Sequence, residues 1–250
     1  KKLEFPLFVK SVSEDASFGI SQASIVTTDE QLTERVAFVH EHTHDDAIVE
    51  QYIEGREIYV GVIGNQRLQT FPPWEMNFGN MPAETARIAT SQVKWNRKYQ
   101  EKHGITTHEA TDLDGPIGDK IQKVCKRVYR ALNLSGYARM DLRLTESGEI
   151  YVLEANANPT IEYGEAFAES AEKIGIDYGS LLQRILTLGL RYKAAWMTGC
   201  FEASDEPLPN RGSARINSIA YPSPPPSNQT MPQSAFCPRH WRHSAILLLT

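Results

Sequence analysis

The chain has 250 residues, and its 26 lysines and arginines against 31 aspartates and glutamates give a formal net charge of −5. Such a chain offers no broad basic field, so we expect it to bind neither nucleic acid nor a membrane surface. The three cysteines are far apart and form no CxxC pair, which argues against a disulfide framework and favours the cytoplasm. No apolar run approaches the ~20 residues of a membrane span. The start at Lys1, directly before an apolar strand, indicates a fragment or a cut domain.

Residues 1–71 have the pattern of short strands around one helix. Thr28-Asp29-Glu30-Gln31 is a capping box, and the apolar stripe that follows it predicts a helix. Arg56–Ile63 alternates in polarity toward Gly64-Asn65, which predicts a hairpin. Further strands are predicted over Phe5–Lys10, Ile20–Ile25, Ala47–Tyr52 and Arg67–Phe71.

The next part of the chain combines a long helix with a second hairpin. Residues 72–112 are polar and aromatic without a period, and we expect them to be irregular. Apolar stripes over Ile117–Leu132 and Leu181–Leu188 predict two helices. Between these stripes, Tyr137–Leu144 and Glu149–Glu154 predict a hairpin. The mixture of hairpins and helices favours an α+β fold, with antiparallel sheets covered on one face by helices.

The composition changes near residue 197. Eight of the 14 prolines lie in 207–238, and no hydrophobic period persists there. Such a stretch buries too little apolar surface to offset its chain entropy, so we expect 198–250 to be a disordered tail after a folded domain over 1–197. Cys237, His240 and His243 in this stretch could suggest a metal site, but a chance cluster in a disordered tail is the favoured interpretation.

The chemistry is concentrated in residues 136–160. Arg139, Asp141 and Arg143 share one face of a strand, because side chains alternate along it. A hairpin would set Asp141 beside Glu154 and Asn156. Two carboxylates and an amide oxygen suit Mg²⁺ or Mn²⁺, and the guanidinium of Arg139 suits phosphate or a developing oxyanion. The alternative is that this is the solvated polar face of a hairpin.

The same segment resembles a known family. Gly136-Tyr-Ala-Arg139-Met-Asp141, followed by Leu153-Glu154-Ala-Asn156-Ala-Asn158-Pro159, resembles the metal-binding hairpin of the ATP-grasp ligases, and most closely of D-alanine–D-alanine ligases. The resemblance covers 1–190, most of the C-terminal catalytic half of such a ligase. It implies an ATP-grasp fold, in which two lobes of antiparallel sheet with helices hold ATP between them. The small nucleotide-binding lobe would be 1–55, and the catalytic lobe 56–197.

The resemblance also implies which residues hold the phosphates of ATP. Lys10 matches the lysine that ends the family's first strand. The loop Glu14–Gly19 matches the mobile loop that closes over the triphosphate, and Ser17 would contribute a hydroxyl there. The family's second lysine is matched by Lys98, with Lys94 as the alternative.

Around the base and ribose, the resemblance implies mostly backbone and acidic contacts, because adenine N6 and the ribose hydroxyls are donors. Arg143 stands where the family has an apolar residue and could stack on the base. The other implied contacts are the Glu50 carboxylate and the backbone of Gln51 and Ile53 to adenine, Glu57 to ribose, and apolar packing by Phe8 and Leu153.

The implied activity is an ATP- and Mg²⁺-dependent carboxylate–amine ligase that works through an acyl phosphate. Arg139 and Lys98 would be catalytic, and Asp141, Glu154 and Asn156 would hold the metal. The partners would be a small-molecule acid and amine, and a homodimer is left open. The alternatives are a non-catalytic ATP-binding module and a ligase of a different acid and amine, because the sequence names neither substrate.

One position bears on the amine substrate. In D-alanine–D-alanine ligases, a His-Ser-Leu stretch carries a serine that helps hold the carboxylate of the second D-alanine. The matching residues here are Gly164-Glu165-Ala166. An ionised Glu165 repels a carboxylate, so we expect an amine substrate other than D-alanine. The alternative is that Glu165 faces solvent at a helix start, where the helix dipole favours acids.

Overall fold

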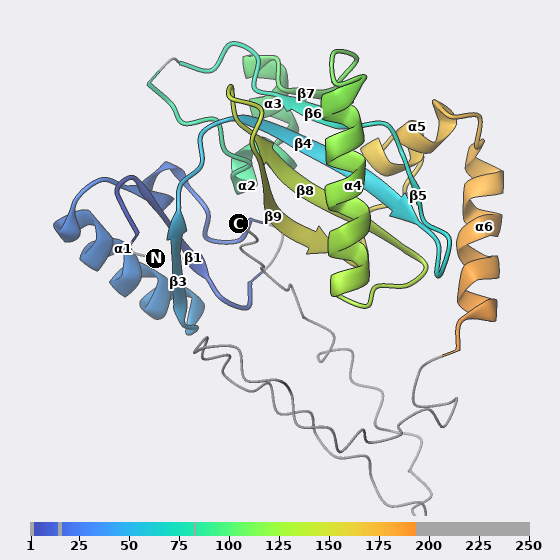
Figure 1. Cartoon of the computed structure of the whole chain (residues 1–250). Helices are drawn as coiled ribbons and strands as arrows, with labels where there is room; N and C mark the ends of the chain where they lie inside the picture. Colours follow the sequence, from blue (N-terminus) through green and yellow to red (C-terminus); the bar gives the residue numbers. More distant parts are fainter. Residues whose placement is uncertain (1–2, 15–16, 83, 194–250) are drawn as a thin grey trace, which may run out of the picture. The chain divides into compact units, whose positions relative to one another are not determined.

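A computed structural model describes residues 3–14, 17–82 and 84–193. The predicted tail, with Cys237, His240 and His243, lies outside these residues. The described chain folds into two antiparallel sheets with helices packed on them, which confirms the α+β prediction (Figure 1). No helix within the described ranges is long and apolar enough to cross a membrane.

The first sheet has three strands in the order β2 (Ile25–Val26), β1 (Leu7–Ser11) and β3 (Ala47–Gln51). Helix α1 (Asp29–Thr43) packs on it, and Thr28 caps this helix by accepting a hydrogen bond from the backbone N of Gln31. The small core between them is apolar, because the buried positions alternate along the strands and fall on one stripe of the helix. Its buried members are Leu7, Val9, Val26 and Val39.

The prediction of a strand over Ile20–Ile25 is wrong for most of its length. The segment forms a 3₁₀ turn, η1 (Gln22–Ser24), and only Ile25 begins a strand. Arg35 of α1 is buried and donates hydrogen bonds to the carbonyl of Gly19 and, at 2.8 Å, to Ser24 Oγ. These contacts satisfy the polar groups of a turn, which an apolar pattern alone does not reveal.

The larger sheet has its main strands in the order β7 (Thr106–Glu109), β6 (Trp74–Asn77), β4 (Arg56–Ile63), β8 (Tyr137–Leu144) and β9 (Ile150–Asn156), and the short β5 (Gln69–Thr70) pairs with β4. The predicted hairpins over 56–71 and 137–154 are therefore confirmed.

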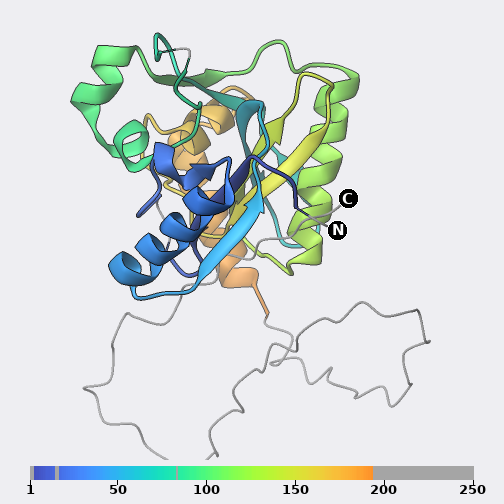
Figure 2. The same cartoon turned by 90° about the vertical axis from the view of Figure 1, so that its left-hand side faces the viewer.

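The two faces of the larger sheet differ in polarity. Helix α4 (Pro116–Ala131) covers one face of the sheet (Figure 2). Its Ile121, Cys125 and Val128 pack against apolar side chains of β4 and β8. Alternation along the strands sends the polar side chains to the other face. Helices α5 (Ala166–Glu172) and α6 (Tyr178–Arg191) pack beside Ile63 and Phe71 in a separate core. The polar face carries Glu57, Tyr59, Arg139, Asp141 and Arg143.

The expectation that 72–112 is irregular is wrong. The segment contains β6, β7 and two short helices, α2 (Ser91–Trp95) and α3 (Arg97–His103). These elements have four to seven residues each, too short for a period to show in the sequence. Helix α5, also short, was expected only in the alternative that places an exposed Glu165 at a helix start, and Glu165 is indeed its exposed N-cap residue.

Gly61 gives a test of the packing between β4 and α5. A Cβ added at Gly61 would lie 2.5 Å from Phe71 Cδ2 and 3.0 Å from Phe167 Cε2. We expect Gly61→Ala to lower the free energy of unfolding by about 1–3 kcal/mol, because the two rings must move. Urea denaturation measures the loss. Gly189→Ala is the control, because nothing lies within 4 Å of its added Cβ on α6, and this change should stabilise by about 0.5–1 kcal/mol. A Gly61→Ala protein as stable as the wild type would contradict this packing.

Candidate functional site

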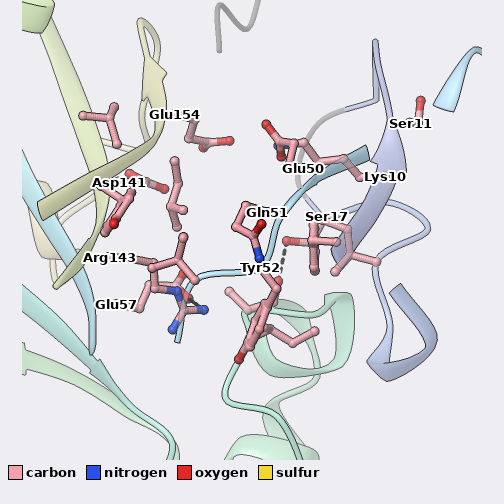
Figure 3. Close-up of a pocket in the computed structure, with 18 of the residues that line it drawn as sticks. Lys10, Ser11, Ser17, Glu50, Gln51, Tyr52, Glu57, Asp141, Arg143 and Glu154 are labelled. Atoms are coloured by element: carbon pink, nitrogen blue, oxygen red, sulfur yellow. Dashed lines mark hydrogen bonds and ion pairs between the residues drawn. The ribbon is translucent and has the colours of Figure 1, made fainter. Parts of the chain in front are cut away.

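A cavity lies between the two sheets, and each sheet supplies part of its wall (Figure 3). Lys10, Ser17 and Glu50 come from the first 52 residues, and Asp141 and Glu154 come from the polar face of the larger sheet. Apolar residues line the same cavity, so it suits a ligand with one apolar part and one polar part. These residues, which we call the apolar slot, include Phe8, Ile20, Ile53, Ile88 and Leu153.

The pairing of β8 with β9 brings the predicted metal ligands together. Asp141 stands opposite Glu154, and Arg139 stands opposite Asn156, in the antiparallel register. The prediction that a hairpin sets Asp141 beside Glu154 and Asn156 is therefore confirmed at the level of the backbone. The register shifts after Asp141, so Leu153 is the extra residue of a β-bulge. The bulge lets Leu153 line the cavity beside Glu154 without moving the core residues of β9 to the wrong face.

Arg139 and Asp141 form a bidentate ion pair on β8. Arg139 Nε and Nη2 donate to the two carboxylate oxygens of Asp141 at 2.7 and 2.8 Å. The guanidinium carbon lies 4.9 Å from the centre of the Tyr59 ring, so the cation is held on the ring face as well. The Asp141 side chain is almost fully buried, and Arg139 remains 20% exposed. Arg139 is thus held in place by Asp141, which lines the cavity, while Arg139 itself, like Asn156, is not among the residues that line it.

Glu154 lies in an environment that disfavours its charge. Burial in the first place, and then the negative charge of Asp141, raise the pKa of Glu154 to about 7, against the opposing effect of Lys94 and Arg139. Two facing carboxylates whose negative charge is only partly compensated form a favourable binding site for a divalent cation.

The donor set agrees with a hard oxygen-binding metal. Within the described part of the chain, no three His, Cys, Asp or Glu side chains gather at one point, so a third protein ligand beside Asp141 and Glu154 would come from another kind of group, such as an amide. Asn156 is in register to serve, and its Oδ1 accepts one hydrogen bond, from the backbone N of Asn158 at 2.9 Å. That oxygen keeps a second lone pair for a metal. The residues present therefore fit Mg²⁺ or Mn²⁺.

The opposite wall carries Lys10 and Ser17. Lys10 Nζ lies 2.8 Å from Glu50 Oε2, and the remaining ammonium protons are available to a ligand. Ser17 Oγ donates to the carbonyl of Ala89 at 2.6 Å, and Ser91 Oγ donates to the Ser17 carbonyl. The loop that carries Ser17 is therefore tied to the segment that leads into α2. Asp15 and Ala16 of the same loop lie outside the described residues.

Gln51 is the last residue of β3, and Ile53 lies just after the strand, in the connection between the sheets. The side chain of Gln51 donates to the carbonyls of Glu4 and Pro6, at 2.7 and 3.1 Å, and accepts from the Glu4 backbone N. Its polar atoms are thus committed to the N-terminal segment, which leaves the backbone of Gln51 to contact a ligand. Ile53 and Tyr52 line the cavity beside it.

Arg143 and Glu57 form a fully buried ion pair at the floor of the cavity. Arg143 Nη2 donates to Glu57 Oε2 at 3.0 Å and to the Arg87 carbonyl at 2.8 Å, and Nη1 donates to the Gly55 carbonyl at 2.7 Å. The guanidinium thus ties the connection between the sheets to the loop before α2. Breaking a buried pair of this kind by removing one partner costs about 3–5 kcal/mol, so Arg143 serves the structure of the floor whether or not it stacks on a base.

The two lysines predicted as alternatives for the phosphate end lie in different surroundings. Lys94 is half-buried on α2 and lines the cavity. Lys98 is exposed on α3 and is not among the residues that line it. The geometry favours Lys94. Glu165, the predicted substrate residue, is exposed at the start of α5 and also lies outside the cavity wall.

Tyr59 is a residue of the polar face that the sequence did not single out. It is buried near the two buried acids Glu57 and Asp141, and its hydroxyl donates to Glu57 Oε1 at 2.7 Å. Burial, and then the charge of Glu57, raise the pKa of the Tyr59 hydroxyl well above its usual value, so it stays a donor. The alternation of β4 could have revealed it, because Tyr59 shares the face of Glu57.

The chain was compared with known proteins. The sequence model of the family described as "D-ala D-ala ligase C-terminus" matches residues 1–187. An uncharacterized protein of Sinorhizobium fredii is 32% identical over 189 residues, which are 76% of this chain and 53% of that protein. D-alanine--D-alanine ligase A of Escherichia coli (strain K12) is 31% identical over 195 residues, which are 78% of this chain and 50% of the ligase.

The chain belongs to the D-ala D-ala ligase C-terminus family. Solved structures agree. The D-alanine--D-alanine ligase of Bacillus anthracis complexed with ATP superposes with a TM-score of 0.57 at 26% identity, over 75% of this chain and 53% of that one. The VanG D-Ala:D-Ser ligase of Enterococcus faecalis superposes with a TM-score of 0.59 at 26% identity, over 74% of this chain and 50% of that one. The fold is therefore ATP-grasp, as predicted. This family member spans about half the length of the relatives it matches.

The raised pKa of Glu154 predicts how stability depends on pH in the absence of divalent metal. Between the unfolded value of 4.5 and the folded value of about 7, the folded protein keeps a proton that the unfolded chain releases. The stabilising contribution of this group is therefore complete below pH 4.5 and is lost as the pH rises through 7. We expect the Tm in EDTA to fall from pH 5 to pH 8, and to fall less in Glu154→Gln.

The control is Glu146→Gln, in the exposed turn of the same hairpin, which should keep the wild-type profile. Mg²⁺ should raise the Tm more at pH 8 than at pH 6, because it competes with the proton for Glu154. An identical Tm profile in the wild type and Glu154→Gln would show that Glu154 titrates normally.

Proposed function

We propose that this chain is the ATP-binding and catalytic part of an ADP-forming carboxylate–amine ligase. The observation that carries the proposal is the pairing of Asp141 with Glu154 on one wall of a cavity whose other wall presents Lys10 (Figure 3). A cavity with acids on one side and a lysine on the other suits a metal-bound polyphosphate. Membership of a family whose relatives include D-alanine--D-alanine ligases supports the same reaction class.

In the proposed reaction, the carboxylate of the acid substrate attacks the γ-phosphate of ATP, which gives an acyl phosphate and ADP. The amine then attacks the acyl carbon and displaces phosphate, so that an amide bond forms. Neither step requires a side-chain nucleophile. The work of the protein is to position the reactants and to stabilise the charge that develops on the oxygens.

Three cations of the chain would carry that work. Lys10 and Lys94, which both line the cavity, would contact the phosphates, and Arg139, which is paired with the lining residue Asp141, would stabilise the transferring phosphoryl group or the tetrahedral oxyanion. Asp141, Glu154 and Asn156 would hold Mg²⁺ or Mn²⁺, which when bound neutralises charge on the phosphate oxygens. Arg139 is suited to its part because Asp141 and Tyr59 fix its direction before any ligand arrives.

The nucleotide would enter with its base in the apolar slot. Ile88 and Leu153 would pack on the base, and the backbone of Gln51 and Ile53 would pair with its edge. Glu50 would accept from the amino group. Each carboxylate oxygen of Glu57 already accepts one protein hydrogen bond, and each keeps a lone pair with which to accept from the ribose hydroxyls.

The amine substrate is proposed to differ from D-alanine. Glu165 is the N-cap residue of α5, but its side chain makes no capping hydrogen bond. A carboxylate in that position would repel the carboxylate of a D-alanine acceptor and attract a cationic group. We therefore propose an amine that carries a second positive charge or lacks a carboxylate at this point.

The test is ADP formation from Mg-ATP and D-alanine, which supplies the carboxylate, with D-alanine alone and with diamines added as acceptors in parallel. We expect Mg²⁺-dependent ADP release that is greater with the diamines. Lys94→Met should lower kcat/KM by roughly 10²–10³-fold, the effect of removing one donor aimed at developing charge. Lys98→Met is the matched control, and we expect it to stay within about twofold because Lys98 is exposed and does not line the cavity.

Four outcomes would revise or contradict the proposal. A large loss in Lys98→Met with none in Lys94→Met would return the phosphate lysine to Lys98. Efficient use of D-alanine would remove the part assigned to Glu165. Mg²⁺-dependent binding of ATP without ADP formation under any condition would favour a non-catalytic nucleotide-binding module, and absence of nucleotide binding would contradict the function altogether.

A further inference from the structure

Tyr59 occupies an unusual position on the polar face of the larger sheet. Its neighbours on β4 and β8 are charged, yet the side chain is a large aromatic that is only 6% exposed. The ring packs with Trp74 and Met76 on one side and meets the guanidinium of Arg139 on the other. A ring that only filled space here would not need a hydroxyl that reaches an acid.

The ring of Tyr59 and the carboxylate of Asp141 together fix Arg139. Arg139 Nε and Nη2 donate to the Asp141 carboxylate, which fixes the plane of the guanidinium. The guanidinium carbon also lies over the Tyr59 ring, 4.9 Å from the ring centre. Within the described part of the chain, Nη1 of Arg139 makes no hydrogen bond, so it remains for a ligand. A planar cation held on two sides presents that donor in one direction.

The hydroxyl of Tyr59 acts at the other end of the site. It donates to Glu57 Oε1 at 2.7 Å, and Glu57 Oε2 accepts from Arg143. Glu57 is 4% exposed, so a missing donor would leave a buried carboxylate with one partner fewer. The hydroxyl therefore helps to hold the Glu57 carboxylate in place at the wall of the cavity.

We infer that Tyr59 is a positioning residue with two separable parts, a ring that orients Arg139 and a hydroxyl that orients Glu57. Through them one side chain sets both ends of the site, the phosphate end and the ribose end. This inference rests on the proposed function, because it takes the ligands of Arg139 and Glu57 to be the phosphate and the ribose of a nucleotide. The arrangement of Arg139 itself is a property of the protein without any ligand.

The two parts are separated by Tyr59→Phe, which keeps the ring, and Tyr59→Leu, which removes it. The first measurement is the ¹⁵N–¹H NMR signal of Arg139 Nε, assigned by its disappearance in Arg139→Lys. We expect one sharp, slowly exchanging signal in the wild type and in Tyr59→Phe. In Tyr59→Leu we expect the signal to broaden and to lose the upfield shift that the ring face produces.

The second measurement is titration with Mg-ATP and Mg-ADP. Tyr59→Phe should weaken both nucleotides alike, by roughly tenfold, as expected for one hydrogen bond to a buried charged group. Tyr59→Leu should show that loss as well. Tyr129→Phe and Tyr129→Leu are the matched controls, because Tyr129 is as deeply buried and its hydroxyl donates to the Gly64 carbonyl at 2.8 Å on the α4 side of the sheet. They should lower the Tm without changing the Arg139 signal or the affinities.

An unchanged Arg139 signal in Tyr59→Leu would overturn the role of the ring. Unchanged nucleotide affinity in Tyr59→Phe would overturn the role of the hydroxyl. A failure of the proposed function would look different. In that case the wild type would bind no Mg-nucleotide, while the Arg139 signal would still report whether the ring holds the guanidinium.

Discussion

Asp141 and Glu154 stand opposite each other on neighbouring strands, and two carboxylates so placed repel unless positive charge surrounds them. Several cations of the site partly offset this repulsion. Arg139 takes both oxygens of Asp141, and Lys94 lowers the pKa of Glu154 without restoring it to an ordinary value. The remaining imbalance is what makes the pair suitable for a divalent cation. The low exposure of Asp141 strengthens each of these interactions, because less water screens them.

A sheet can carry such charges only if its other face is secured by apolar packing. Met140 and Leu142 alternate with the charged residues of β8 and lie under α4, so the helix holds the strand in register while the polar face stays open to the cavity. The bulge at Leu153 serves both demands. It keeps Val152 in the core and adds an apolar side chain to the cavity wall beside an acid, which a regular strand would not allow.

The sequence predicted the parts that follow from periodicity. The long stripe of α4 and the alternation of β4, β8 and β9 gave the main sheet, and alternation alone placed Asp141 with Glu154 and Asn156. Short elements such as α2 were not predicted, because five residues show no period. The position of Lys94, which lies on α2, was therefore not predicted either. The hydrogen bonds of Arg143 to two carbonyls were also beyond prediction, since they depend on where the loops around Gly55 and Arg87 come to lie.

The most direct test of the central claim is a crystal structure of this chain with Mg²⁺ and a non-hydrolysable ATP analogue. The account predicts the metal on Asp141, Glu154 and Asn156, the base in the slot between Ile88 and Leu153, and Lys10 and Lys94 on the phosphates. A nucleotide bound outside this cavity, or a metal held by other residues while Asp141 and Glu154 stay unligated, would contradict it.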